Sequence, residues 1–112
     1  MPGVSGTTLG LDEKVEAAIS YLLFFVTGIV ILLLEQKSYF VRFHAAQSTV
    51  TFIALYVLYV LAEFFPGERL LRALIAILYV IFWVVGIVKA YSGELYKFPV
   101  LGDIAEMLVG RR

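Results

Sequence analysis

The fold of this chain turns on the stretch Ser38-Tyr39-Phe40-Val41-Arg42-Phe43-His44-Ala45-Ala46-Gln47-Ser48, which joins two long apolar segments. It contains the only histidine of the chain, three aromatic side chains, and then a run of small and polar residues. Aromatic residues gather at the level of lipid headgroups in membrane proteins, whereas polar residues inside a hydrophobic helix face other helices. We therefore expect this stretch to open a membrane helix whose first turns are polar on one side.

Composition places the chain among membrane proteins. Of its 112 residues, 62% are hydrophobic, and the mean hydropathy is +0.94. A soluble domain of this size cannot hide so much apolar surface. Three uncharged runs, 17–34, 45–62 and 73–88, each approach the roughly 20 residues that cross about 30 Å of hydrocarbon as a helix. The sequence predicts an all-α polytopic membrane protein with three transmembrane helices.

Charge and cysteine content argue against several classes of function. Nine basic and nine acidic residues give zero net charge, so no basic surface favours nucleic acid. The chain has no cysteine, which excludes disulfides, thiolate metal sites and cysteine nucleophiles. A lone histidine is a poor metal centre, and no nucleophile and base have a recognised spacing. We expect no metal, no cofactor and no catalysis, with the lipid bilayer and other membrane proteins as partners.

The expected helices follow from short polar breaks along the chain. Residues 1–12 are rich in glycine and predict a flexible tail. A three-helix bundle over 13–93 then contains helices at about 13–35, 39–65 and 68–92, each antiparallel to the next because the connections are short. Small residues allow helices to approach closely in membranes, and the candidates for such packing are Gly28, Gly86 and Ala90.

A polar stripe runs along the start of the second helix. His44, Gln47, Ser48 and Thr51 follow the i, i+3, i+4, i+7 pattern, so they share one face. Such a face is expected to meet a partner helix or a wet cavity. His44 either hydrogen-bonds a neighbouring helix or a phosphate, or responds to pH.

The carboxyl-terminal region, residues 94–112, predicts a tail at the membrane interface. Asp103 and Glu106 have the spacing of a capping box, which would open a short amphipathic helix at about 103–109. Arg111 and Arg112 can bind anionic headgroups. Other residues expected to anchor the protein at the interface are Tyr39, Phe40, Arg42, Phe43, Tyr96 and Lys97.

The distribution of lysine and arginine predicts an orientation in the cell membrane. With three crossings, the loop 35–43 and the carboxyl-terminal tail share one side and carry six of the nine basic residues. Basic residues favour the cytoplasmic side. The loop and the carboxyl terminus are therefore expected in the cytoplasm, and the amino terminus outside.

Two blocks of sequence resemble a known family. Residues 40–47, Phe-Val-Arg-Phe-His-Ala-Ala-Gln, and residues 88–99, Val-Lys-Ala-Tyr-Ser-Gly-Glu-Leu-Tyr-Lys-Phe-Pro, resemble prokaryotic relatives, of unknown function, of the Tic-twenty-like import component of the chloroplast inner envelope. The plant protein has four helices and belongs to a preprotein translocon. The resemblance implies a subunit that works by assembling with others.

Two functions remain open from the sequence. The chain is expected to be an assembly or scaffold subunit, related to protein translocation or membrane-protein handling, that associates with itself or with other membrane proteins through the polar stripe. The alternative is a small homo-oligomeric channel or transporter in which the same stripe lines the pathway.

Overall fold

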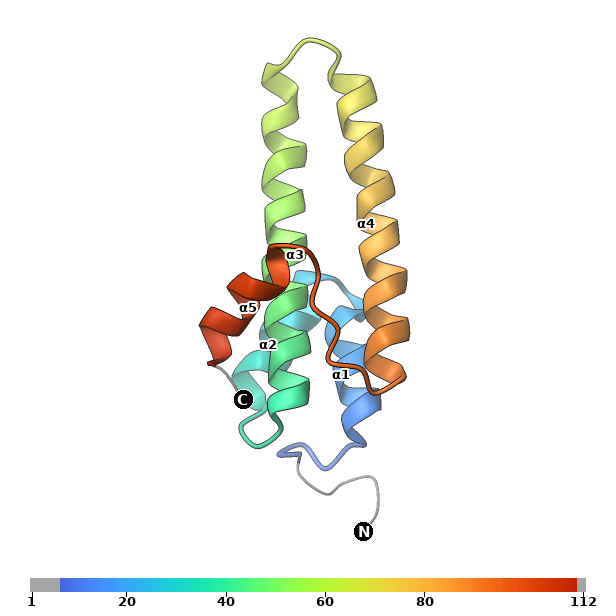
Figure 1. Cartoon of the computed structure of the whole chain (residues 1–112). Helices are drawn as coiled ribbons and strands as arrows, with labels where there is room; N and C mark the ends of the chain where they lie inside the picture. The colour runs from blue at the N-terminus through green and yellow to red at the C-terminus, as the bar shows by residue number, and fades with distance from the viewer. Residues whose placement is uncertain (1–6, 111–112) are drawn as a thin grey trace.

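The computed structural model describes residues 7–110, and every regular element in that range is helical (Figure 1). The elements are α1 (Glu13–Leu22), α2 (Phe25–Leu34), α3 (Tyr39–Leu61), the short 3-10 helix η1 (Ala62–Phe64), α4 (Glu68–Tyr91) and α5 (Leu101–Val109).

The two long helices, α3 and α4, form an antiparallel hairpin that sets the length of the molecule (Figure 1). Ser38 caps α3 by accepting a hydrogen bond from the amide of Val41 at 3.2 Å. Gly67, with φ of 75°, occupies the left-handed conformation that starts α4. Both helices are long and apolar enough to span a membrane, and they agree with the expected second and third helices.

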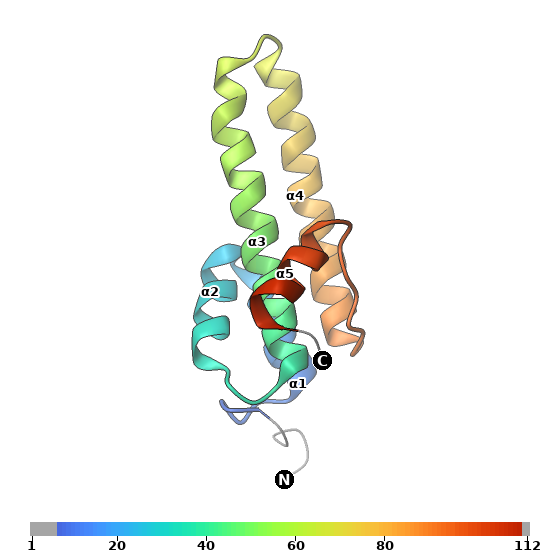
Figure 2. The same ribbon diagram turned by 60° about the vertical axis from the view of Figure 1, so that its left-hand side comes forward.

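The first expected helix, 13–35, is instead two ten-residue helices that fold back on each other. The chain reverses at Leu23 and Phe24, so α2 returns to the end from which α1 started (Figure 2). A contact between the two ends shows this directly, because the amide of Thr8 donates to the carboxylate of Glu35 at 2.9 Å. A third membrane crossing is therefore not confirmed. The uncharged run is long enough to cross but is used as a half-length hairpin.

The hairpin brings Thr8 beside the connection that follows α2, at the same end of the molecule. The expected orientation, with the amino terminus outside and loop 35–43 in the cytoplasm, stays a prediction. Residues 7–12 are held in place rather than forming part of a free tail. The hydroxyl of Thr7 donates to the carbonyl of Leu11, and that of Thr8 accepts from the amides of Gln36 and Lys37. Residues 1–6 of the expected tail lie outside the described residues.

After α4, residues 92–100 form an extended strap that lies across α3 and leads to α5 (Figures 1 and 2). Helix α5 begins at Leu101, two residues before the predicted start, after Val100 in a positive-φ conformation. The expected capping box is not formed, because Asp103 and Glu106 both pair with Lys97, at 3.0 and 3.4 Å. Arg111 and Arg112 lie outside the described residues.

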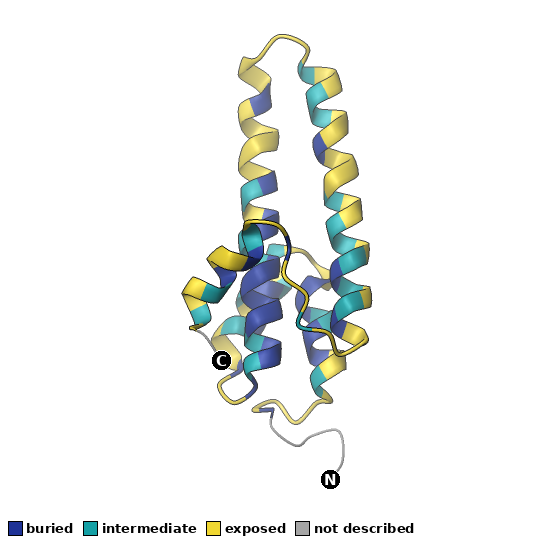
Figure 3. Cartoon of the chain, viewed as in Figure 1, coloured by how far each residue is buried: buried dark blue, intermediate teal, exposed yellow. Residues whose placement is uncertain are grey.

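The molecule is asymmetric along its long axis. At one end, here called the base, α1, α2, the strap and α5 surround the first half of α3, and buried residues concentrate there (Figure 3). At the other end, the tip, only α3, η1 and α4 remain, and most of their side chains are exposed (Figure 3). Tyr21, Phe43, Phe52 and Val41 are the largest fully buried apolar or aromatic side chains of the base.

Candidate functional site

The base is organised around a polar network in which no side chain is exposed. Gln47 and His44 come from α3 and Tyr21 from α1, and all three have an exposed fraction of 0%. His44 and Gln47 lie on one face of α3 because they are three residues apart. Three large polar side chains are thus fully enclosed in the base.

Two members of the network hold the strap. His44 Nε2 donates to the carbonyl oxygen of Glu94 at 2.7 Å. Gln47 Nε2 donates to the carbonyl oxygen of Tyr96 at 2.9 Å, and Gln47 Oε1 accepts from the amide of Phe98 at 2.8 Å. An extended segment has no internal hydrogen bonds, so its buried backbone groups need partners from outside. The side chains of α3 supply them.

Tyr21 closes the network. Its hydroxyl donates to His44 Nδ1 at 2.8 Å and accepts from Gln47 Nε2 at 2.9 Å. These bonds assign the Nε2–H tautomer to His44, since Nδ1 must accept while Nε2 donates. Every donor of Gln47 and both ring nitrogens of His44 are then occupied. A fully satisfied buried network rigidifies its surroundings.

A second set of polar contacts stabilises the reversal between α1 and α2. Ser48 Oγ donates to the carbonyl oxygen of Phe24 at 3.0 Å, and Trp83 Nε1 donates to that of Leu22 at 3.1 Å. Thr27 Oγ1 accepts from the amide of Leu23 at 3.0 Å and donates to the carbonyl of Ser20 at 3.3 Å. Non-helical backbone within a membrane is tolerated where protein satisfies it.

Phe24 holds an unusual conformation at this reversal, with φ of 59° and ψ of −132°. Such a conformation costs about 1–3 kcal/mol for a residue other than glycine. Aromatic contacts offset this cost. The ring of Phe24 packs edge to face on Phe52 and Tyr79, with centroids 5.2 Å apart in each pair.

Substituting Thr27 by valine tests how much the reversal depends on these bonds. Valine has the shape of threonine but cannot accept from Leu23 or donate to Ser20, so we expect the free energy of unfolding in detergent to fall by about 1–3 kcal/mol. Thr49→Val is the matched control, because the Thr49 hydroxyl bonds only the carbonyl of Ala45 in its own helix. Equal effects of the two substitutions would contradict this role for Thr27.

The predicted polar stripe is thus enclosed by the chain itself. His44, Gln47, Ser48 and Thr51 are all buried, and the first three bond the strap, α1 or the reversal. Thr51 Oγ1 has no hydrogen-bond partner. Sequence reasoning missed Tyr21, whose partners are side chains of another helix. The only signal for Tyr21 was a polar tip inside an apolar run.

The small residues singled out for helix packing lie at close contacts. A Cβ on Gly86 would come within 2.5 Å of the Tyr21 ring, and one on Gly28 within 2.8 Å of Thr49 Oγ1. Ala90 is fully buried. These positions bring α4 against α1, and α2 against α3.

The expected interface anchors divide into two groups. Phe40 and Phe43 are buried in the base, so they pack within the protein instead of contacting lipid. Arg42 donates to the carbonyls of Leu32 and Glu35 at 3.2 and 2.7 Å, which caps the end of α2.

Three other expected anchors lie closer to the surface. The Tyr39 hydroxyl donates to the carbonyl of Gly110 at 2.7 Å, and Tyr96 is 39% exposed. Lys97 is exposed, and its hydrogen bond to Asp103 raises its pKa.

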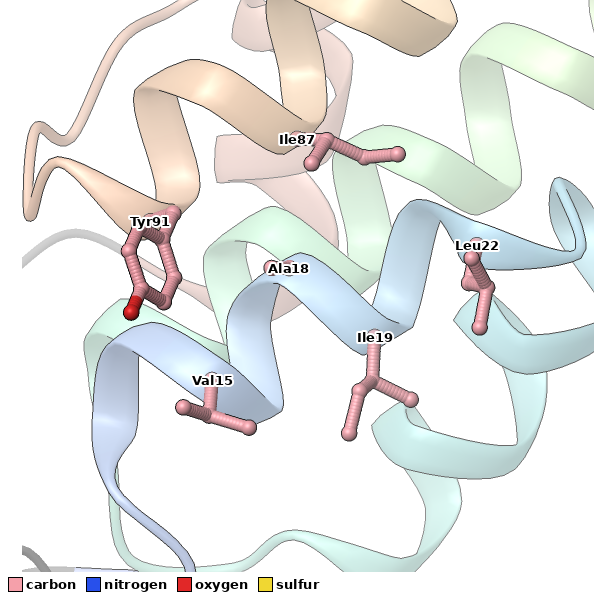
Figure 4. A pocket seen from close by; sticks show the side chains of 6 residues that line it. All are labelled: Val15, Ala18, Ile19, Leu22, Ile87 and Tyr91. Atoms are coloured by element: carbon pink, nitrogen blue, oxygen red, sulfur yellow. The ribbon is translucent and has the colours of Figure 1, made fainter.

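A shallow apolar hollow lies on the outer surface of the base. It has a volume of about 190 Å³, lies between α1 and α4 and is lined by Val15, Ala18, Ile19, Leu22, Ile87 and Tyr91 (Figure 4). Its side chains offer a hydrocarbon-like surface. Within residues 7–110, no three His, Asp or Glu side chains gather in a group that could hold a metal ion.

Comparison with known proteins identifies the family of the chain. Residues 12–105 match the model of a family described as the magnetosome magnetite crystal formation protein family. The chain belongs to this family. No solved structure matches it.

Several curated relatives of this family member are archaeal membrane proteins. Two UPF0132 membrane proteins of Methanocaldococcus jannaschii are 48% and 47% identical to it over 99 and 100 residues, covering 88% and 89% of this chain and 71% and 91% of theirs. A UPF0132 membrane protein of Archaeoglobus fulgidus is 48% identical over 101 residues, covering 89% of this chain and 98% of its own. The expected relationship to the chloroplast import component is therefore wrong, and the link to protein translocation that it implied is not shown.

Proposed function

We propose that this membrane protein is an assembly subunit whose copies associate through the tip halves of α3 and α4. The observation that supports this most directly is that, within residues 7–110, only α3, η1 and α4 form the tip, and most of their side chains there are exposed. An apolar groove of about 450 Å³ separates α3 from α4 there, with Leu58, Leu61, Leu74 and Leu78 among its lining residues.

Helix association in a membrane depends on close packing, because lipid tails are as apolar as leucine. The base meets this requirement within one chain, since α1, α2 and α5 all pack on α3. At the tip, α3 and α4 present large exposed side chains, including Val57, Leu70 and Ile77. A second copy brings matching helices of the same length and composition to fill the groove.

An oligomeric channel has less support. The side chains that would line a pathway, His44, Gln47 and Ser48, are bonded inside a single copy. A conducting arrangement would have to break those bonds. No catalytic role is part of the proposal, and the family's description, which refers to magnetite crystal formation, is compatible with a scaffold in a membrane.

We further propose that the base faces the cytoplasm. Among the described residues, the base carries Lys14, Lys37, Arg42, Lys89 and Lys97, whereas the tip carries Arg69 and Arg72. Counted over these same seven residues, three crossings would divide them four to three, whereas the hairpin moves Lys14 to the base side and divides them five to two.

Cysteine crosslinking in native membranes tests the assembly. The chain contains no cysteine, so Leu74→Cys at the tip and Val26→Cys on the exposed face of α2 each introduce a single thiol. We expect a short bifunctional maleimide to give a dimer with Leu74→Cys and not with Val26→Cys, because only the tip groove meets a second copy.

A monofunctional maleimide checks that both thiols are accessible. Accessible thiols with no dimer from Leu74→Cys would contradict assembly through the tip. Solute flux through vesicles containing such an uncrosslinked protein would support the channel instead.

A further inference from the structure

Two buried carboxyl groups lie beside each other at the outer end of the base. Glu16 is in the first turn of α1, and Glu35 directly follows α2. The helical hairpin brings these two points together, and both residues have an exposed fraction of 0%. Buried carboxyl groups are expected to be paired or neutral.

Glu35 is held as a carboxylate by backbone amides. The amide of Thr8 donates to both of its oxygens, and the amides of Lys37 and Ser38 donate to Oε2, all at 2.9 Å. Burial alone would raise the pKa of Glu35, but the adjacent Glu16 carboxyl group and the hydrogen bonds from these amides outweigh it and lower the pKa to about 2. Glu35 therefore keeps its negative charge near neutral pH.

Glu16 has the opposite environment. Neither of its carboxyl oxygens has a hydrogen-bond partner, although both are buried. Burial, and then the neighbouring carboxyl groups of Glu35 and Glu13, raise the pKa of Glu16 to about 8. Two adjacent buried carboxylates repel each other, so one of them takes up a proton.

We propose that Glu16 and Glu35 form a proton-binding site. Its proton keeps residues 7 and 8, here called the clamp, closed over the base. With the proton on Glu16, the pair carries one negative charge, and Glu35 remains free to accept the amide of Thr8. Loss of the proton places a second charge in the same enclosed space. Opening the clamp then admits water to both carboxylates.

The sign of the pH dependence follows from the raised pKa of Glu16. A proton bound more tightly in the closed form stabilises it fully below the ordinary glutamate value of about 4.3. That stabilising contribution decreases as pH rises from there through about 8, and above this range the proton no longer contributes. The clamp is therefore closed in neutral and mildly acidic conditions and loosens in alkaline ones.

The charged groups around the pair do not replace the proton. On α1, Glu13 accepts from the Ser38 hydroxyl, which adds negative charge nearby. On α3, the Arg42 guanidinium donates to the backbone carbonyls of Leu32 and Glu35, and His44 is bonded within the network. The Lys37 side chain is exposed on the connection, and Lys89 of α4 pairs with Glu94 at 3.1 Å.

Infrared difference spectroscopy on the full chain in phosphatidylcholine vesicles tests the site. We expect the carbonyl stretch of one protonated carboxylic acid at about pH 6–7 and its disappearance by about pH 9. Glu16→Gln should abolish this band, and Glu13→Gln, the matched control on the same helix, should keep it. If Glu16→Gln does not fold, the titration of the unmodified chain still decides, because an exposed carboxyl is ionised at these pH values. A missing band, or one that survives Glu16→Gln, would overturn the site.

Hydrogen exchange at the Thr8 amide tests the clamp. After correction for intrinsic exchange, its protection is expected to fall about tenfold or more between about pH 6 and pH 9 in the unmodified chain. The fall should be less than about twofold in Glu16→Gln, which has no proton to lose. Protection that is unchanged while the infrared band disappears would overturn the link between the proton and the clamp.

Discussion

Replacing Gln47 by leucine is expected to release the strap from α3 and to lower the free energy of unfolding by about 2–4 kcal/mol. Leucine fills a similar volume but leaves the buried amide of Phe98 and the carbonyl of Tyr96 without the partners that hold them at 2.8 and 2.9 Å. Each orphaned buried backbone group costs about 1–3 kcal/mol. The Tyr21 hydroxyl loses its donor as well.

Denaturant titration in detergent measures the loss of stability, and hydrogen exchange at Phe98 shows where it occurs. The control is Gln36→Leu, because Gln36 is exposed and its side chain bonds only the carbonyl of Leu33. If Gln47→Leu left both stability and the protection of Phe98 unchanged, the network would not be what holds the strap.

Replacing Gly86 by alanine is expected to destabilise the base by about 3 kcal/mol through overpacking. The added Cβ would lie 2.5 Å from two ring carbons of Tyr21, whose side chain is fully enclosed and cannot move aside freely. Displacing the ring also strains the bond from its hydroxyl to His44. Alanine is favoured over glycine in a helix by up to about 1 kcal/mol, so any net loss reports the clash.

The control substitution is Ala76→Val, which enlarges an exposed position on the same helix. Thermal unfolding of the two variants separates the clash from a general effect on α4. A double variant with Tyr21→Phe and Gly86→Ala shows whether the destabilisation passes through the Tyr21 hydroxyl. If it does, the double variant loses less stability than the sum of the losses in the two single variants. A Gly86→Ala protein as stable as the parent would rule out the close contact.

The long helices could be predicted from the sequence because charges mark where each begins and ends. The uncharged runs between Arg42 and Glu63, and between Arg72 and Lys89, each have the length of one membrane-spanning helix. The run before Glu35 is equally long, yet it is broken at Phe24. Nothing local marks that break, because the usual signal is glycine or proline. The groups that stabilise it, Ser48 and Trp83, come from other helices.

The polar stripe was identified from its spacing, but its partner was not. The pattern of His44 and Gln47 indicates a face that seeks hydrogen bonds, and it does not distinguish another copy from a later segment of the same chain. The two sequence blocks that resembled an import component, 40–47 and 88–99, are the two halves of this contact. Membership of the family depends on residues 12–105 as a whole, and two short blocks are too little to identify it.

The amino-terminal residues show a limit of reasoning from composition. Glycine, serine and threonine around Thr8 indicate mobility when the segment is considered alone. Their hydroxyl and amide groups are nevertheless suited to a buried carboxylate, and Glu35 provides one. The segment is ordered because the buried Glu35 carboxylate needs hydrogen-bond donors. The sequence analysis treated Glu35 only as part of a short polar break.

The reversal at Phe24 also bears on how the protein enters its membrane during synthesis. In the arrangement proposed above, with the base in the cytoplasm, α1 and α2 start and end on the cytoplasmic side, so no part of residues 7–38 needs to be carried across the bilayer. Within residues 7–110, this proposed arrangement requires only the short connection between α3 and α4, with η1 and the turn at Gly67, to be translocated. The chain can therefore insert as one helical hairpin, and the surrounding segments can dock on it afterwards from the side where they were made.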